Sequence, residues 1–235
     1  MGSIQTGIRR CAAQIAAAAL PFAAIVIATP AAAQTAAAAN TIVVTGIARP
    51  SVPNLFGTVA VPARVSRYSD GWFRSRQDAS SHPAMQRLIA PARSLPKQMQ
   101  IAYIQQAVTQ QIHWRSDATE WGKHDYWASA AQTLDHGAGD MEDRAIVKLQ
   151  ALKALGFPGR DLYLTMGRDK VGGQLTVLVV RSNGQFYVLD DLGGKPVPAA
   201  YREGFEPFLT FGANTTWLHG RRVHLAAAGG RTATR

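Results

Sequence analysis

Three carboxylates stand within one turn of one another where a helix is predicted to begin. Asp140, Glu142 and Asp143 follow Gly139 and precede a run of helical apolar spacing. Carboxylate oxygens are the ligands that hard cations prefer. Acids in a first helical turn also complement the helix dipole, and an aspartate such as Asp140 caps free backbone N–H groups without any metal. The residue types alone leave both roles open.

The chain offers no thiol to this region. Its one cysteine, Cys11, lies in an N-terminal segment that we expect to be removed. The remaining protein then has no disulfide, no thiolate metal ligand and no cysteine nucleophile. Hydroxyl and imidazole groups do occur, but their spacing pairs none of them in the way that hydroxyl hydrolases require. These groups are Ser129, Thr133, Thr176, His113, His124 and His136.

The first 33 residues have the layout of an export signal. Arg9 and Arg10 form a basic start, an uncharged apolar run continues to Thr29, and residues 31–33 are three alanines that suit a cleavage site. The apolar run is long enough to suggest a membrane anchor, but Pro30 and the alanines favour removal. We therefore expect a periplasmic or secreted protein without stable membrane insertion after cleavage of the signal peptide.

The chain left after cleavage suits one globular domain. We interpret residues 34–53 as a flexible linker, residues 54–225 as the domain and residues 226–235 as a disordered tail. The full chain has a formal net charge of +10. Its arginines are scattered rather than gathered in runs, which is typical of solvated surface. We therefore expect no nucleic-acid partner.

Apolar residues recur at helical spacing in the first half of the domain. Met99, Ile101, Ile104, Val108 and Ile112 predict one helix within residues 96–113. A shorter helix is expected over residues 127–134, before Gly137. The longer helix that begins near Asp140 should end at Gly156 and Pro158.

The spacing then changes to the period of two that strands show. We expect strands at residues 162–166, 175–180, 186–189, 207–211 and 216–219, and the Asn183-Gly184 pair predicts a hairpin between the second and third. Residues 59–81 alternate too irregularly for more than short pieces. Helices followed by antiparallel strands indicate an α+β fold, with a helical N-terminal part packed on an antiparallel β-sheet.

The sequence around the predicted helix start resembles the bacterial transglutaminase-like cysteine proteinases. This family, which has a transglutaminase-like or papain-like cysteine protease fold, includes calcium-dependent periplasmic proteases that clip surface adhesins. It reads Gly-Asp-Cys-Glu-Asp where this chain has residues 139–143, an Ala-His-Met-Val-Leu type strand at the site of Gln174, and Leu-Asp-Asn-Leu at residues 189–192. Further matches lie at residues 55–58, 125–127, 155–158 and 208–217. The likeness covers about residues 55–220.

The resemblance implies that both reacting groups of the protease have been replaced. Met141 stands at the position of the catalytic cysteine, and a thioether cannot lose a proton or form an acyl-enzyme. Gln174 is the counterpart of the histidine by register with the following strand, and an amide does not act as a base near neutral pH. Asp190 matches the acid that orients the histidine, and it is retained.

The resemblance also implies a metal site and a binding cleft. Asp140 and Glu142 match the acids that bind Ca²⁺ in the adhesin proteases, so calcium is the candidate cofactor, with helix capping as the competing explanation. Trp127 and Asp191 would lie at the old cleft, although a tryptophan there is more commonly part of the core.

These observations favour a catalytically inactive homologue, a pseudoenzyme that binds a peptide, adhesin or receptor partner in the cell envelope. Loss of two triad members outweighs the loss of one because the members act as a unit. Regulation of biofilm adhesins is a further implication of the resemblance. The alternative is a hydrolase or peptidase that works through a nucleophile other than cysteine.

Overall fold

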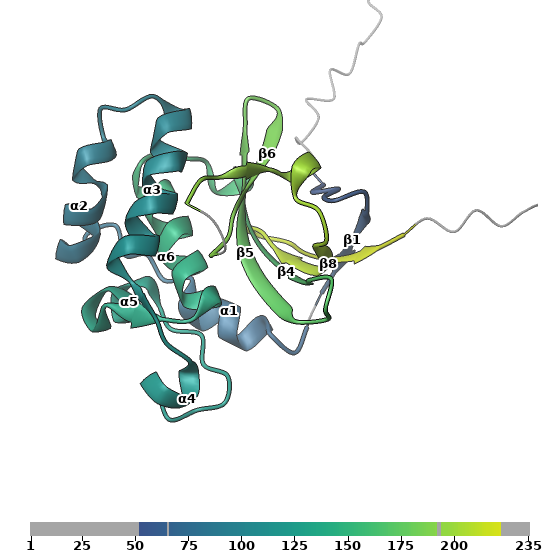
Figure 1. The fold of residues 1–235 in the computed structure, drawn as a ribbon, viewed down its shortest axis with the longest axis horizontal. Coiled ribbons are helices and arrows are strands. Elements are labelled where there is room, and N and C mark those ends of the chain that lie inside the picture. Colours follow the sequence, from purple (N-terminus) through teal and green to yellow (C-terminus); the bar gives the residue numbers. More distant parts are fainter. Residues whose placement is uncertain (1–51, 65, 192–193, 222–235) are drawn as a thin grey trace, which may run out of the picture. The chain divides into compact units, whose positions relative to one another are not determined.

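The computed structural model describes residues 52–64, 66–191 and 194–221 (Figure 1). The predicted signal peptide, the tail and most of the predicted linker lie outside these residues. Within the described ranges, no helix has both the length and the apolar character needed to cross a membrane. The α+β prediction is confirmed, because helices and an antiparallel sheet make up the described domain (Figure 1).

The helices fall where the apolar spacing placed them, with additions. The predicted helices are α3 (Lys97–Gln111), α5 (Ala130–His136) and α6 (Met141–Ala154). Ser129 caps α5 through a capping box, and Gly137 ends it in the left-handed conformation with φ 65°. The helices that sequence reasoning did not assign are α1 (Ser69–Ser75), α2 (Pro83–Ile89) and α4 (Asp117–Glu120).

The described residues form a seven-stranded antiparallel sheet in the order β1-β9-β8-β4-β5-β6-β7. Asn183 and Gly184, both at positive φ, connect β5 to β6, so the predicted hairpin is confirmed. The outer strands β1 and β7 each contain a proline, Pro62 and Pro198. The seven strands are β1 (Val59–Ala63), β4 (Leu162–Arg168), β5 (Gln174–Ser182), β6 (Gln185–Leu189), β7 (Val197–Pro198), β8 (Glu206–Phe211) and β9 (Thr216–Gly220).

The alternation of side chains along β5 divides the core in two. Leu178 and Val180 belong to the larger core cluster, on the face against which the helices pack, whereas Val177 and Val179 belong to a smaller cluster on the other face. Helix α6 packs directly on β5 and also against α3 and α5. By this alternation, positions 174 and 176 share the face that meets α6.

A short parallel pair of strands fixes the beginning of α6. Strand β2 (His113–Trp114) pairs with β3 (Ala138–Gly139), which runs straight into the helix. Gly139 has no room for a side chain, because a Cβ atom there would lie 2.7 Å from the Cβ of Asp143. Asp140 then caps α6 by accepting from the Asp143 N–H at 3.4 Å. Met141 is therefore the first residue of the helix.

Candidate functional site

Two cavities meet the first turn of α6, and Met141 lines one of them. This one, which we call the Met141 cavity, has a volume of about 250 Å³. Its polar lining comes from Arg144, Thr176, Asp190 and Asp191, and its apolar lining from Trp114, Met141, Leu175 and Val177. The other, which we call the acidic pocket, has a volume of about 450 Å³ and is lined by Asp117, Asp125, Asp140, Glu142, His124 and Gln174, together with Arg67 and Tyr68.

The predicted triad positions are divided between these two cavities. Met141 and Asp190 line the Met141 cavity, whereas Gln174 lines the acidic pocket, where its Oε1 accepts from the Tyr68 hydroxyl at 3.1 Å. Thr176 also lines the Met141 cavity, and it lies on the face of β5 that meets α6. Sequence reasoning weighed Thr176 only as a nucleophile; the strand period of two could have placed it beside Met141.

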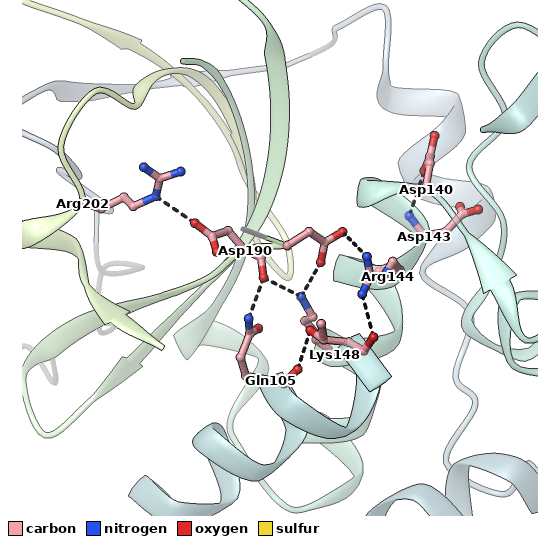
Figure 2. Close-up of polar contacts among 9 residues, drawn as sticks. Gln105, Asp140, Asp143, Arg144, Lys148, Asp190 and Arg202 are labelled. Atoms are coloured by element: carbon pink, nitrogen blue, oxygen red, sulfur yellow. Dashed lines mark hydrogen bonds and ion pairs between the residues drawn. The ribbon is translucent and has the colours of Figure 1, made fainter. Parts of the chain in front are cut away.

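The two successive acids after β6, Asp190 and Asp191, have different side-chain partners, and Figure 2 shows Asp190 pointing towards Arg202. Asp190 Oδ2 accepts from Arg202 Nε at 2.8 Å. Asp191 is turned towards α6, where it accepts from Lys148 Nζ at 2.9 Å and from Arg144 Nη1 at 3.1 Å. The retained acid of the prediction is therefore held by an arginine, while its neighbour makes the contact with the helix.

Arg144 and Lys148 place two cations almost fully inside the protein, with 5% and 1% of their surface exposed. Burial lowers the pKa of Lys148, and the charge of Asp191 acts in the opposite direction. Lys148 Nζ and Gln105 Nε2 also donate to the backbone oxygen of Asp190, at 3.1 and 2.6 Å (Figure 2). This network fixes the end of β6 against α3 and α6.

The acidic pocket brings together three carboxylates whose oxygens lie within 4.8 Å of one another. They belong to Asp117, Asp140 and Glu142. Burial, reinforced by the neighbouring charges, raises the pKa of Asp140 to about 7 and that of Glu142 to about 9. Burial also raises the pKa of Asp117. Crowded and poorly solvated carboxylates of this kind favour a bound proton or a cation.

Asp117 is the member of this group that sequence reasoning missed. It begins α4, and its Oδ2 accepts from the Tyr126 N–H at 2.6 Å. Its Oδ1 is buried and has no hydrogen-bond partner among the described residues. Only the path of the chain through α4 brings it to Asp140, so no local pattern could have revealed it.

Trp127 lies in the core rather than on either cavity. It is 2% exposed and packs edge-on against Phe211, with the ring centroids 5.8 Å apart. Asp143, the third carboxylate of the motif, is also buried and accepts from the Ala128 N–H at 2.7 Å. Asp143 thus ties the helix start to the segment before α5, and a contribution of Trp127 to partner recognition stays a prediction.

Comparison with solved structures finds LapG of Legionella pneumophila. Its calcium-bound form is 28% identical with a TM-score of 0.51, over 57% of this chain and 76% of LapG. A second LapG structure is 25% identical with a TM-score of 0.51, over 67% and 90% of the two chains. The EGTA-treated form gives the same identity and TM-score, over 67% and 87%. Comparison with curated proteins finds no match.

Comparison with protein families gives a match over residues 69–200 to the family described as bacterial transglutaminase-like cysteine proteinase BTLCP. The matched residues make up more than half of the chain. They include Met141, which lines the Met141 cavity, and Asp117, Asp140 and Glu142, which line the acidic pocket. The likeness to LapG supports the same fold. The chain therefore belongs to the bacterial transglutaminase-like cysteine proteinase family.

Proposed function

We propose that this protein is a non-catalytic member of its family, which binds a peptide or protein partner of the cell envelope through the cleft that includes the Met141 cavity. The observation that carries the proposal is the methionine at the first position of α6. A helix N-terminus favours a thiolate, because its free N–H groups and dipole stabilise negative charge. The thioether of Met141 has no proton to lose, so this arrangement yields no nucleophile.

The opposite wall of the cleft lacks a base as well. Gln174 and Thr176 are the helix-facing residues at the beginning of β5. Neither an amide nor a hydroxyl takes up a proton near neutral pH. The acid that would orient a histidine has other partners, since Asp190 binds Arg202 and Asp191 binds Arg144 and Lys148. The residues of the cleft therefore suit binding of a partner rather than acyl transfer.

The proposal places the protein in the periplasm or outside the cell. Its support is the export-type sequence of residues 1–33, together with the adhesin-cleaving periplasmic proteases that the chain resembles. An adhesin segment or a membrane receptor domain is the kind of partner that this location would supply. Regulation of biofilm adhesins would follow from such binding without any cleavage.

Calcium is the cofactor that the acidic pocket suits. Calcium takes six to eight oxygen ligands, and carboxylates are foremost among them. Asp117, Asp140 and Glu142 offer three, and the buried Asp117 Oδ1 that lacks a partner is the kind of atom a cation would satisfy. A calcium ion bound there would hold the tip of α6 to α4. It would have no reacting group to activate, so its contribution would be structural.

The test uses purified protein comprising residues 34–235. We expect no cleavage of fluorescent casein or of an adhesin-derived protein, and saturable enrichment of a set of peptides from a phage-displayed library. A Met141→Trp variant, which fills the Met141 cavity, should lose that enrichment while keeping its far-ultraviolet circular dichroism. Turnover that disappears in Met141→Trp or in Thr176→Val would refute the proposal and favour a hydrolase with a non-cysteine nucleophile.

A further inference from the structure

Two residues that line the Met141 cavity each have a buried polar atom without a hydrogen-bond partner among the described residues. Arg144 Nε and Thr176 Oγ1 make no hydrogen bond to any described residue. The parent residues are only 5% and 3% exposed. Buried polar atoms in folded proteins are hydrogen-bonded in about 90% of cases or more, because an unmade bond costs about 1–3 kcal/mol. Two such exceptions beside one cavity point to a ligand that supplies an acceptor.

The charges around the cavity favour a neutral acceptor over an anion. The other donors of Arg144 are already used, Nη1 by Asp191 at 3.1 Å and Nη2 by the Thr109 carbonyl at 3.2 Å. Asp191 thereby pairs with the guanidinium, and its second oxygen accepts from the ammonium of Lys148. Asp190 lines the same cavity and would repel a carboxylate, as would Asp191.

The remaining walls are apolar and the space is small. Met141, Leu175 and Val177 line the cavity, and Trp114, which is 61% exposed, stands at its mouth. A volume of about 250 Å³ lies below the range of roughly 300–1,000 Å³ that is usual for drug-sized ligands. It therefore suits a single residue of a longer chain. An amide carbonyl has two lone pairs, so one oxygen can accept from both free donors.

We propose that the Met141 cavity holds one apolar residue of a bound peptide, whose backbone carbonyl oxygen accepts hydrogen bonds from Arg144 Nε and Thr176 Oγ1. This inference rests on the proposed peptide-binding function and names the residue class and the two donors. They recognise the amide without attacking it.

The test follows the Met141 methyl resonance in protein labelled with ¹³C-methyl methionine. The chain has five methionines, so the spectrum is simple to assign by substitution. The probes are the N-acetyl, N-methylamide derivatives of leucine and of aspartate, and N-acetylleucine with a free carboxylate. We expect a saturable shift of the Met141 resonance with the leucine amide, and binding at least several-fold weaker for both charged probes.

The discriminating variant is Thr176→Val, which preserves the shape of the side chain and removes only the hydroxyl. We expect it to weaken binding of the leucine amide by about 3- to 10-fold, in line with one lost hydrogen bond. Its thermal stability should equal or exceed that of the wild type, because an unpaired buried hydroxyl is gone. The matched control is Thr165→Val, since Thr165 is buried but is paired with Thr210 at 3.0 Å. That variant should lose stability and keep its affinity.

Three results would overturn the inference. One is the absence of any saturable Met141 shift with the leucine amide up to tens of millimolar. Another is tighter binding of a charged probe, and the third is unchanged affinity in Thr176→Val. If library peptides still bind the protein without shifting the Met141 resonance, peptide binding stands and only this assignment fails. If no peptide binds at all, the proposed function fails with it.

Discussion

Replacing Glu142 by glutamine should raise the stability of the metal-free protein and remove its stabilisation by calcium. Burial and the charge of Asp140 raise the pKa of Glu142 from 4.5 to about 9. At pH 7 the folded protein keeps this proton while the unfolded chain has released it. The linkage lowers stability progressively as pH rises above 4.5, by up to about 3 kcal/mol at pH 7. Glutamine carries no such penalty, so the metal-free variant should be more stable by about 1–3 kcal/mol.

Calcium should offset this advantage of the variant. A ligand present at about 100 times its Kd stabilises the folded state by roughly 3 kcal/mol. For a domain of this size that corresponds to a Tm increase of roughly 2–4 °C per kcal/mol. The wild type should show this increase, because Asp117, Asp140 and Glu142 supply three carboxyl groups, and Glu142 can release its proton when the ion binds. The glutamine variant has a neutral side chain in place of one of them and should show little or none.

The assay is thermal unfolding at pH 7 in EGTA and in millimolar CaCl₂, followed by circular dichroism. Glu206→Gln is the matched control, because Glu206 is exposed and pairs only with Arg221 among the described residues. It should leave both Tm values close to those of the wild type. A lower Tm for Glu142→Gln in EGTA would refute the reasoning on burial. A wild-type Tm that does not respond to calcium would refute the metal site.

Four further predictions concern other parts of the structure. Burial lowers the pKa of His219, whose ring is hydrogen-bonded by Thr58 and Thr210, to about 4. The contribution of His219 to stability should therefore fall as pH drops from 6.5 towards 4. In urea unfolding, the wild type should lose about 1 kcal/mol relative to His219→Gln between pH 7 and 5, after allowance for solvent screening. Lys148→Met should lower the free energy of unfolding by about 3 kcal/mol in urea, because Arg144 is then the one remaining salt-bridge partner of Asp191 among the described residues. A loss below about 1 kcal/mol would contradict the network. Gly139→Ala should cost about 2 kcal/mol in the same measurement, since the new Cβ would lie 2.7 Å from that of Asp143, whereas Gly194→Ala, with no atom within 4 Å, should cost far less. The double variant Met141→Cys with Thr176→His should react with a cysteine-directed acylating probe about 100-fold faster than Met141→Cys with Gln174→His. The reason is that Thr176 lines the Met141 cavity and Gln174 does not. Equal labelling of the two double variants would count against this placement.

The helices and strands that sequence reasoning found are those with strong periodicity. Helix α3 carries its apolar residues at three- and four-residue steps, and the β5–β6 hairpin is announced by Asn183-Gly184. Strand β1 was not predicted, because only Ala60 of its five residues is buried and the strand shows no alternation of buried and exposed residues. Helix α1 is seven residues long and buries only Ser69, Trp72 and Ser75, which is too short a pattern to separate from loop.

The candidate site was predictable only where one motif contains it. Asp140, Met141 and Glu142 are adjacent in sequence, and the helix start orients them towards two different cavities. Asp117 and Arg202 reach the site from α4 and from the segment before β8, and tertiary packing alone brings them there. The side-chain direction of Asp190 and Asp191 depends on where the pleat of β6 ends, which no residue pattern fixes to a single position.

The prolines at the two margins of the sheet bear on how this protein behaves at high concentration. An unpaired strand edge is a template on which a neighbouring copy can add its own strand, and short, proline-containing edges resist such growth. Here β1 has five residues with Pro62, and β7 has two residues ending in Pro198. Neither edge strand presents a long unbroken row of backbone N–H donors. The sheet should therefore resist fibril growth by strand addition, without a disulfide.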